Sequence, residues 1–247
     1  MAVQGERKQT MKKIMFSLAA ATALGTFAAV ESSNIVGYGQ NSLREGYSLV
    51  TAQFVGIGGG VASLDSIKAA GTEASDNVTL STVDEFGTAV DTYAWNDWLD
   101  ESNPCWVDGS FEPVSGITVT PGMAFWTSGS EADQIVQTSG EVGTQDVVVN
   151  LREGYTLVGN PFPVDVSLQD IVAGGNEASD NVTLSTIDEF GTAIDTYAWN
   201  DWLDEDNPCW VDGSFEPVSG VTFAPGVGLW TSGSNDSQFV RFPAPEL

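Results

Sequence analysis

Apolar and polar residues alternate over short stretches of the chain, and this period of two predicts β-strands. Residues 77–83 alternate and are rich in β-branched side chains, residues 84–87 supply a turn that contains a glycine, and residues 88–95 alternate again. This order predicts a β-hairpin. Further strands are expected at 47–50, at 134–137 and, as a second hairpin around the Pro121-Gly122 turn, at 117–120 and 123–127.

One short segment has the features of a helix instead. Ser63 is suited to be an N-cap, Asp65 and Ser66 lie in the first turn, and Gly71 supplies a stop. We therefore expect a short helix within 63–70. The same pattern recurs at 167–173, where we expect a second helix.

An internal duplication organises the chain. Residues 43–50 recur at 151–158, and residues 73–116 recur at 177–220 with three differences. Repeats of about 100 residues have the size of ordinary domains. The sequence therefore predicts an all-β protein of two tandem homologous β-sandwich or barrel domains, each with one short helix. The three differences are Val83/Ile187, Val90/Ile194 and Ser102/Asp206.

The N-terminus has the layout of a secretory signal peptide, in which a basic segment precedes an apolar run that ends in small residues. A membrane anchor is the alternative, but the run at 14–30 is short for one. We expect cleavage, no later membrane insertion, and an extracellular or cell-surface location. The predicted divisions are a signal peptide at 1–28, an N-terminal strand segment at 29–42, a first β domain at 43–139, a linker strand at 140–150 and a second β domain at 151–247.

The charge of the chain is almost entirely negative. It has 8 Lys+Arg, 34 Asp+Glu and no His, a formal charge of −26. Residues 1–28 hold four of the cations and one of the acids, so the remainder carries −29. Such a charge argues against nucleic acids and anionic membranes as partners. The lack of His removes the Ser-His-Asp and Cys-His pairs and every His metal ligand.

The segment 93–109, repeated at 197–213, is rich in aromatic and acidic residues. Exposed Trp faces stack on sugar rings while Asp and Asn bond the hydroxyls, so this composition fits a carbohydrate-binding module. The alternative, favoured by the large apolar area of tryptophan, is that Trp95, Trp98 and Trp106 fill the core and the acids solvate a turn.

The acids of this segment also suggest chemistry. Closely spaced carboxylates suit Ca²⁺, the only ion we expect in a chain with no other cofactor, although a solvated acidic surface explains them equally. Paired carboxylates also serve glycosidases, but any two acids of this chain satisfy that pattern, and we predict that it is not an enzyme. The candidate calcium ligands are Asp97, Asp100, Glu101, Asp108, Asp201, Asp204, Glu205 and Asp212.

Cys105 and Cys209 are the only cysteines and occupy equivalent positions in the two repeats. A disulfide within one repeat is therefore excluded. A bridge between the repeats, bridges between chains and two buried thiols stay open, and the tendency of free cysteine to be buried favours the thiols.

The run from Leu151 to Pro163 contains Gly-Tyr-Thr-Leu-Val-Gly-Asn-Pro-Phe-Pro. It resembles a motif of β-rich secreted repeat modules of bacteria, and 225–230 is similar to the aromatic strand that closes such modules. The first copy departs from the motif at 51–54. The resemblance implies export and a β fold, and no activity. The two-domain, exported and acidic layout is also similar to the subunits of extracellular bacterial fibrils.

The duplication suggests that chains assemble with one another. If one copy binds the other through two different surfaces, each copy retains an unused surface, and chains can continue head to tail. We therefore expect a homopolymer, a structural subunit of an extracellular fibre or surface layer whose strands pair between subunits. A tandem carbohydrate-binding module with polysaccharide as partner is the alternative. The strands expected to form the assembly contain Ile35, Val36, Tyr38, Val147, Val148, Val149, Phe239, Val240 and Phe242.

Overall fold

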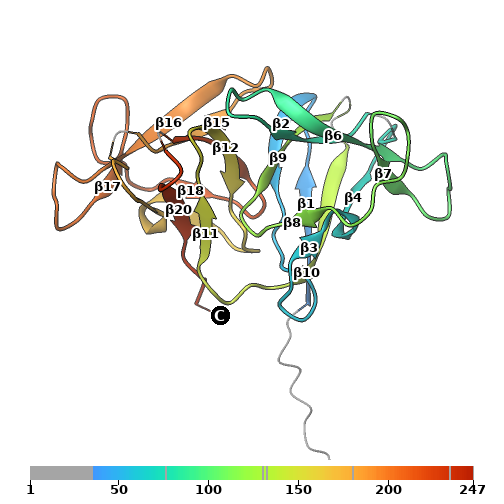
Figure 1. Ribbon diagram of the computed structural model, residues 1–247, viewed down its shortest axis with the longest axis horizontal. Helices are drawn as coiled ribbons and strands as arrows, with labels where there is room; N and C mark the ends of the chain where they lie inside the picture. Colours follow the sequence, from blue (N-terminus) through green and yellow to red (C-terminus); the bar gives the residue numbers. More distant parts are fainter. Residues whose placement is uncertain are drawn as a thin grey trace, which may run out of the picture. The chain divides into compact units, whose positions relative to one another are not determined.

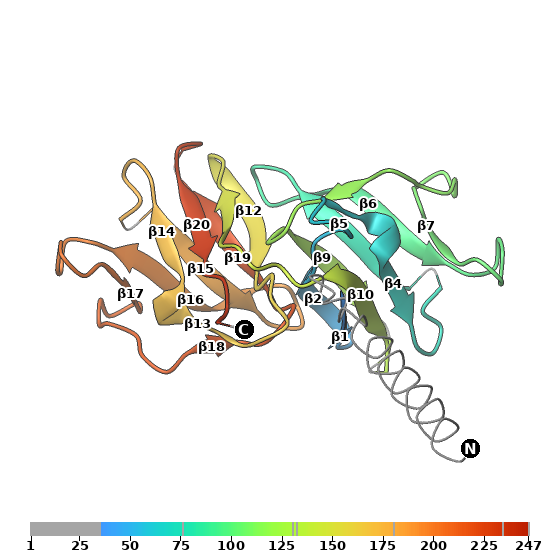
Figure 2. The ribbon, with the colours of Figure 1, turned by 90° about the horizontal axis from the view of Figure 1, so that it is seen from below.

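The computed structural model describes residues 36–246 apart from positions 76, 130, 132, 180 and 234 (Figures 1 and 2). The described chain is all-β, as predicted, and its strands form small antiparallel sheets. The predicted signal peptide, and Ile35 among the expected assembly residues, lie outside the described part. Contacts group the described residues into one compact unit.

The strands follow one order twice, so β1–β10 are here called the first repeat and β11–β20 the second. The first repeat contains β1 (Val36–Ser42), β2 (Gly46–Thr51), β3 (Ala62–Ser63), β4 (Ile67–Ala70), β5 (Thr79–Val83), β6 (Ala89–Asn96), β7 (Cys105–Val107), β8 (Thr118–Val119), β9 (Ala124–Gly129) and β10 (Ile135–Glu141). The second contains β11 (Val147–Asn150), β12 (Gly154–Gly159), β13 (Val166–Ser167), β14 (Val172–Gly174), β15 (Thr183–Ile187), β16 (Ala193–Asn200), β17 (Cys209–Val211), β18 (Thr222–Phe223), β19 (Gly228–Gly233) and β20 (Phe239–Phe242).

Each repeat builds three sheets. A five-stranded sheet has the order β2-β9-β5-β6-β7 in the first repeat and β12-β19-β15-β16-β17 in the second. A three-stranded sheet has the order β1-β10-β4 or β11-β20-β14, and a two-stranded one pairs β3 with β8 or β13 with β18. The main apolar cluster of each repeat combines residues of the five- and three-stranded sheets, such as Phe125 with Val136. The core therefore lies between sheets, as the alternating pattern requires.

The predicted helices are wrong beyond a single turn. Leu64–Ser66 and Leu168–Asp170 form 3₁₀ turns, and β4 or β14 follows. Ser63 is the N-cap of the first turn, as expected, because its side chain accepts a hydrogen bond from the Asp65 amide. In β4, Ile67 and Ala69 are buried while Lys68 between them is exposed. This period of two, with a β-branched residue at its start, favours pairing with β10 over continuation of the helix.

The hairpin at 84–87 is confirmed, and the second predicted hairpin is not. Gly87, with φ +79°, closes the first turn by donating to Asp84 O at 3.1 Å. The Pro121-Gly122 turn also forms, because the Met123 amide donates to Thr120 O at 3.0 Å. The strands that flank this second turn diverge, however: β8 pairs with β3, whereas β9 pairs with β2 and β5. A tight turn reverses the chain without deciding which sheet each arm joins.

The expected assembly strands pair within the chain. Val36 and Tyr38 lie on β1, which pairs with β10, and Val147, Val148 and Val149 lie on β11, which pairs with β20. The linker strand thus pairs within the second repeat, although the Val147 and Val149 side chains lie against Gly122 of the first. Strand β20, which carries Phe239, Val240 and Phe242, is central, with β11 on one side and β14 on the other. Both of its hydrogen-bonding edges are used, so pairing with another subunit through β20 is excluded in this fold.

The two repeats meet through equivalent surfaces. The Tyr47 amide donates to Glu189 O at 3.0 Å, and the equivalent Tyr155 amide donates to Glu85 O at 3.1 Å. Each cross-repeat contact of this kind occurs twice with the roles of the repeats exchanged, which is the mark of a pseudo-two-fold axis. A third apolar cluster fills this junction, with Leu49, Val83, Ala124, Leu157 and Ile187 buried in it.

This symmetry corrects the head-to-tail expectation. An isologous contact uses the same patch on both partners, so it leaves no complementary patch unused on either one. The contact predicted from the duplication was heterologous, and the structure contradicts it. Duplication alone therefore gives no reason for the chain to polymerise.

Candidate functional site

The aromatic–acidic segment divides its tryptophans between core and surface. Trp95 and Trp106 face each other across β6 and β7 with ring centroids 5.1 Å apart, and both are buried. The indole N–H of Trp106 donates to Ile67 O at 2.7 Å, which satisfies its buried polar atom. Trp98 is 55% exposed, and its counterpart Trp202 is 58% exposed. The expectation that all three tryptophans of the segment fill the core is confirmed for two and wrong for the third.

A buried asparagine explains why Trp98 leaves the core. Asn96 ends β6, is fully buried, and accepts a hydrogen bond from the Leu99 amide at 3.0 Å. This bond turns the chain sharply after the strand and carries Trp98 to the surface. Asn200 makes the same bond to the Leu203 amide at 2.9 Å, so the exposed position of Trp202 has the same cause.

Phe111 lies beside Trp98 on a second turn. Its ring centroid is 6.1 Å from that of Trp98, and its backbone has a left-handed φ of +61°. A non-glycine residue in this region costs about 1–2 kcal/mol, so the turn must be held by other contacts. Asp108 holds it, since one carboxylate oxygen accepts from the Ser110 and Glu112 amides at 2.8 and 3.1 Å. The result is a phenyl ring that is 54% exposed on a fixed turn.

We call each exposed pair, Trp98 with Phe111 and Trp202 with Phe215, a terminal platform. The second pair repeats the first, with centroids 6.1 Å apart and φ +61° at Phe215. The platforms adjoin β7 and β17, which lie at opposite ends of the described unit (Figure 1). The sequence indicated the aromatic segment, but not which tryptophans are exposed and not the role of the phenylalanines.

The acids of the segment hold turns. Asp100 accepts from the Ser102 amide and hydroxyl at 3.0 and 2.6 Å, and these bonds lower the pKa of its carboxyl group below the usual value. Asp204 accepts from the Asn207 side chain and the Asp206 amide at 3.1 Å each, and its pKa is lowered too. These hydrogen bonds therefore favour the charged form of both carboxyl groups.

The predicted calcium ligands do not converge in the described chain. Among residues 36–246, gaps aside, no group of three or more His, Cys, Asp and Glu side chains is placed to hold a metal ion. Calcium binding stays a prediction that this geometry does not support. Asp97 and Asp201 bond through their amides to Ser75 and Ser179, Asp108 and Asp212 hold the phenylalanine turns, and Glu101 and Glu205 lie on the surface.

Both cysteines are free thiols and half-buried. Cys105 lies on β7 and Cys209 on β17, at opposite ends of the described unit (Figure 1). A bridge between the two repeats of one chain is therefore excluded in this fold. The thiols are less buried than expected because β7 and β17 are the outer strands of their sheets.

A second aromatic group lies at the junction and was missed by the sequence reading. Trp126 and Trp230 face each other across the pseudo-two-fold with centroids 5.4 Å apart. Tyr47 packs on Trp126 at 5.1 Å and Tyr155 on Trp230 at 5.0 Å. The signal in the sequence was the repeated Leu-Arg-Glu-Gly-Tyr run, which places both tyrosines.

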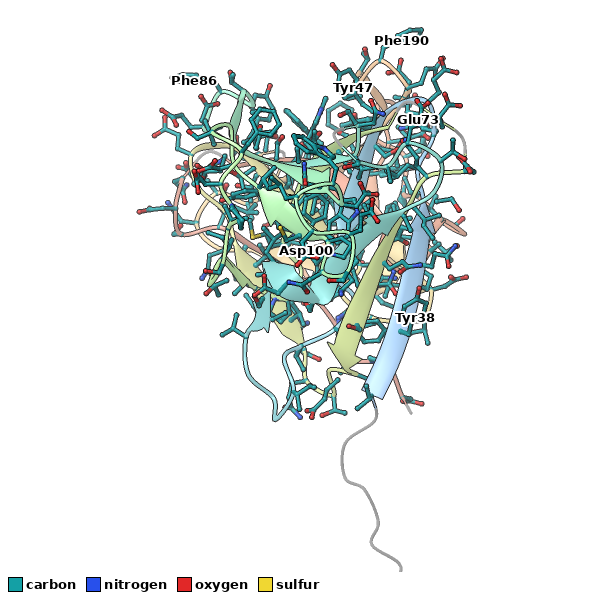
Figure 3. All side chains as sticks on the ribbon, turned by 90° about the vertical axis from the view of Figure 1, so that its right-hand side faces the viewer. Tyr38, Tyr47, Glu73, Phe86, Asp100 and Phe190 are labelled. Atoms are coloured by element: carbon teal, nitrogen blue, oxygen red, sulfur yellow. The ribbon has the colours of Figure 1, made fainter. Side chains whose placement is uncertain are left out.

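Two hairpin tips flank this aromatic group. Gly87 packs against Trp230, and Gly191 against Trp126, where any β-carbon would collide with the indole ring. The residues before these glycines, Phe86 and Phe190, project from separate tips at the top of Figure 3 and are each 76% exposed. The junction thus places four aromatic rings between two exposed phenylalanines.

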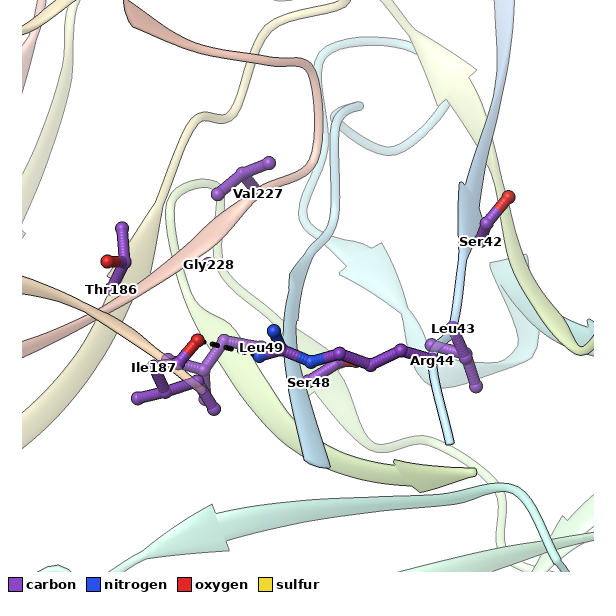
Figure 4. A pocket seen from close by; sticks show the side chains of 9 residues that line it. All are labelled: Ser42, Leu43, Arg44, Ser48, Leu49, Thr186, Ile187, Val227 and Gly228. Carbon is purple, nitrogen blue, oxygen red and sulfur yellow. Dashed lines mark hydrogen bonds between the residues drawn. The ribbon is translucent and has the colours of Figure 1, made fainter. Parts of the chain in front are cut away.

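Arginines lock the junction from both sides. Arg44 crosses to the second repeat and donates to Ile187 O at 2.7 Å and to Asp188 O at 3.0 Å. Figure 4 shows this side chain spanning a pocket lined by both repeats, including Ser48, Thr186 and Gly228. Arg152 donates to Val83 O in the reciprocal contact. These guanidinium groups are therefore engaged by backbone carbonyls.

Comparisons of the chain with protein-family models, curated proteins and solved structures found no match. In the described residues, no helix is long and apolar enough to cross a membrane.

Proposed function

We propose that the protein is an exported, two-ended carbohydrate-binding protein whose terminal platforms each bind a polysaccharide. The observation that carries the proposal is the exposed Trp–Phe pair at each end, held on turns that fix both rings. The proposal takes each repeat as one β domain of a tandem pair and takes the N-terminal segment as an export signal.

Exposed aromatic pairs of this kind are costly to maintain. A tryptophan and a phenylalanine that are each more than half exposed leave apolar area in water that burial would stabilise by about 25 cal/mol per Å². In Phe111 and Phe215 a left-handed backbone adds strain. Rigid aromatic faces with carboxylates and amides beside them are well suited to sugars, which present an apolar C–H face and hydroxyls at its rim.

The placement of the two platforms supports a bivalent role. They lie at opposite ends of the described unit, so one short oligosaccharide cannot contact both (Figure 1). A long chain that bends back, or two separate chains, can occupy both sites. Two linked sites raise the avidity for such ligands without any new contact.

Tryptophan fluorescence and calorimetry with a panel of soluble polysaccharides test the proposal. We expect binding to quench the exposed indoles, with a stoichiometry of two sites per chain. A variant with Trp98→Ala and Trp202→Ala should lose binding. The matched control is Phe86→Ala with Phe190→Ala, which removes two exposed rings at the junction and should bind normally. Retention of full affinity by the tryptophan variant would contradict the proposal.

A structural subunit of a fibre or surface layer is the second candidate. Strand β1 favours it, since in the described chain β1 pairs with β10 alone and exposes Val36 and Tyr38 on one face. An unprotected edge of this kind is a site for pairing with another chain. Negative-stain electron microscopy with Ca²⁺ and with chelator tests this candidate. Regular filaments support it, and single particles in both conditions contradict it.

A further inference from the structure

The terminal platforms lie in stretches of the chain whose charged residues are all negative. No Lys or Arg occurs between Lys68 and Arg152, or between Arg152 and Arg241. Both platforms and the turns around them fall in these two cation-free stretches. Exposed carboxylates flank the first platform in sequence at Asp97, Asp100, Glu101 and Glu112, and their equivalents Asp201, Asp204, Glu205 and Glu216 flank the second.

Three of the four cations among the described residues are engaged elsewhere. Arg44 and Arg152 donate to carbonyls at the junction. Arg241 forms a salt bridge with Asp146, with 3.1 Å between the charged atoms. Lys68 is exposed on β4, in the three-stranded sheet, and follows Ile67, whose carbonyl accepts from the Trp106 indole of β7. The fold therefore places no arginine at the platforms to neutralise their carboxylates.

From this arrangement, and resting on the proposed function, we infer that the platforms select glycans with positive charge, namely polymers of amino sugars whose amines are free and protonated. The C–H face of such a sugar stacks on the indole as a neutral sugar does. Its ammonium group gains two further interactions, attraction to the aromatic face and to the surrounding carboxylates. A polysaccharide of uronic or sulfated sugars meets like charge at every approach and is repelled.

A cationic peptide carries the same ammonium group, but the platform favours a glycan. Its recognition surface is a pair of rings whose centroids lie 6.1 Å apart and whose planes are tilted by 51° in the first platform and 55° in the second. A lysine side chain presents a narrow stem to such a surface, whereas a pyranose presents a broad apolar face. Oligolysine is therefore the competitor to include in the test.

The experiment compares three soluble polymers of equal length: an amino-sugar polymer with free amines, its fully N-acetylated counterpart, and a neutral glucose polymer. At low ionic strength we expect the free-amine polymer to bind at least about tenfold more tightly than the acetylated one, from exposed cation–π and ion-pair contacts at two sites. We expect this advantage to shrink as salt rises toward about 0.5 M, because exposed charges are screened.

A charge-neutralising variant separates selectivity from binding. Glu101→Gln, Glu112→Gln, Glu205→Gln and Glu216→Gln remove four carboxylates that form none of the turn-holding bonds described above. This variant should lose the preference for the amine polymer and keep its affinity for the neutral ones. The matched control, Glu45→Gln, Glu85→Gln, Glu153→Gln and Glu189→Gln, changes the net charge equally but at the junction, and it should keep the preference.

The outcomes are distinguishable. Equal affinity for the amine and acetylated polymers would overturn the inference and leave the proposed function standing. Binding of none of the three polymers would overturn both. Displacement of the amine polymer by oligolysine of equal charge, at equal concentration, would identify a general polycation site and overturn selection of a glycan. A preference lost equally in the junction variant would show that net charge, and not the platform, is responsible.

Discussion

The two repeats are nearly identical over 73–116 and 177–220, yet the turn that follows β2 in the first and β12 in the second is held by different side chains. After β12, Asn160 is fully buried and organises its turn, donating to Val164 O and Phe223 O and accepting from the Phe162 amide. After β2, the equivalent position is Ala52, and the chain runs through a glycine-rich stretch with four extra residues.

The first repeat replaces the asparagine with a carboxylate from a distant strand. Glu141, at the end of β10, is 7% exposed and accepts hydrogen bonds from the Gly58 and Gly59 amides at 2.8 and 3.1 Å. Both glycines have positive φ, which lets their amides converge on one side chain. Phe54 and Phe162 are buried at equivalent positions in both cases. The fold thus requires the buried phenylalanine and a turn whose backbone groups are hydrogen-bonded. Which side chain makes those hydrogen bonds differs between the repeats.

Of the changes that test this difference between the repeats, replacing Asn160 should lower the free energy of unfolding most. Asn160→Ala removes three hydrogen bonds, two of which serve the buried Phe223 carbonyl and Phe162 amide, and we expect a loss of about 3 kcal/mol in the free energy of unfolding. Urea denaturation measures this loss. The reverse change, Ala52→Asn, should also destabilise the protein, because the first repeat has no partners arranged for the amide. A gain in stability from Ala52→Asn would contradict our account.

Removing the Glu141 carboxylate of the first repeat should lower the free energy of unfolding somewhat less. Glu141→Ala removes two charge-assisted bonds, and we expect a cost of about 2 kcal/mol, with faster hydrogen exchange at Gly58 and Gly59. The equivalent position in the second repeat is Pro245, and Pro245→Ala serves as the control. Unchanged exchange at both glycine amides in the Glu141 variant would show that the loop is held by something else.

Where the repeats are equivalent, the effects should be equal. Arg44→Ala and Arg152→Ala each remove a guanidinium group that crosses the junction, and we expect each to lower the free energy of unfolding by about 1–2 kcal/mol. Thermal denaturation of the two variants in parallel makes this a test of the pseudo-two-fold. A difference above about 1 kcal/mol would show that the reciprocal contacts are not energetically equivalent.

The smallest effect concerns the one polar difference between 73–116 and 177–220, Ser102 against Asp206. The Ser102 hydroxyl is the largest cause of the lowered pKa of Asp100. A lowered pKa means that the charged form stabilises the turn above the unfolded pKa near 3.8, and that this stabilisation is lost as the pH falls through the folded value. In Ser102→Asp, NMR titration should show a higher pKa for Asp100, while Asp204 stays unchanged. An unchanged pKa at Asp100 would contradict the role of the hydroxyl.

Local features of the fold were predictable from local residues. The alternation in 77–83 and 88–95 gave a real hairpin, and the glycines at 87 and 122 adopt the left-handed turns expected of them. The errors arose where partners are distant in sequence. The partner of the strand after Ser66 and the separation of β8 from β9 both depend on which sheet edge is available, and the alternation along a strand does not specify its partner.

The candidate site was predictable in composition but not in exposure. The sequence places three tryptophans in one segment, and the fold sends two inward because they lie opposite each other on β6 and β7. Trp98 is exposed because Asn96 turns the chain, and this role of Asn96 cannot be predicted until the burial of its side chain is known. The junction between the repeats was harder to predict than the platforms. A symmetric contact uses the same residues in both copies, so the repeated sequence contains no difference that would mark it.

Fusion of the two copies in one chain has a genetic consequence. In a symmetric homodimer every substitution appears twice, so a change that suits one side of the axis is imposed on the other. Here, Gly226 lies against Asn41 and Gln53, whereas its counterpart Gly122 lies against Val147 and Val149. The covalent link lets the two sides mutate independently while the shared core holds them together, and one half can acquire a new specificity while the other preserves the ancestral one.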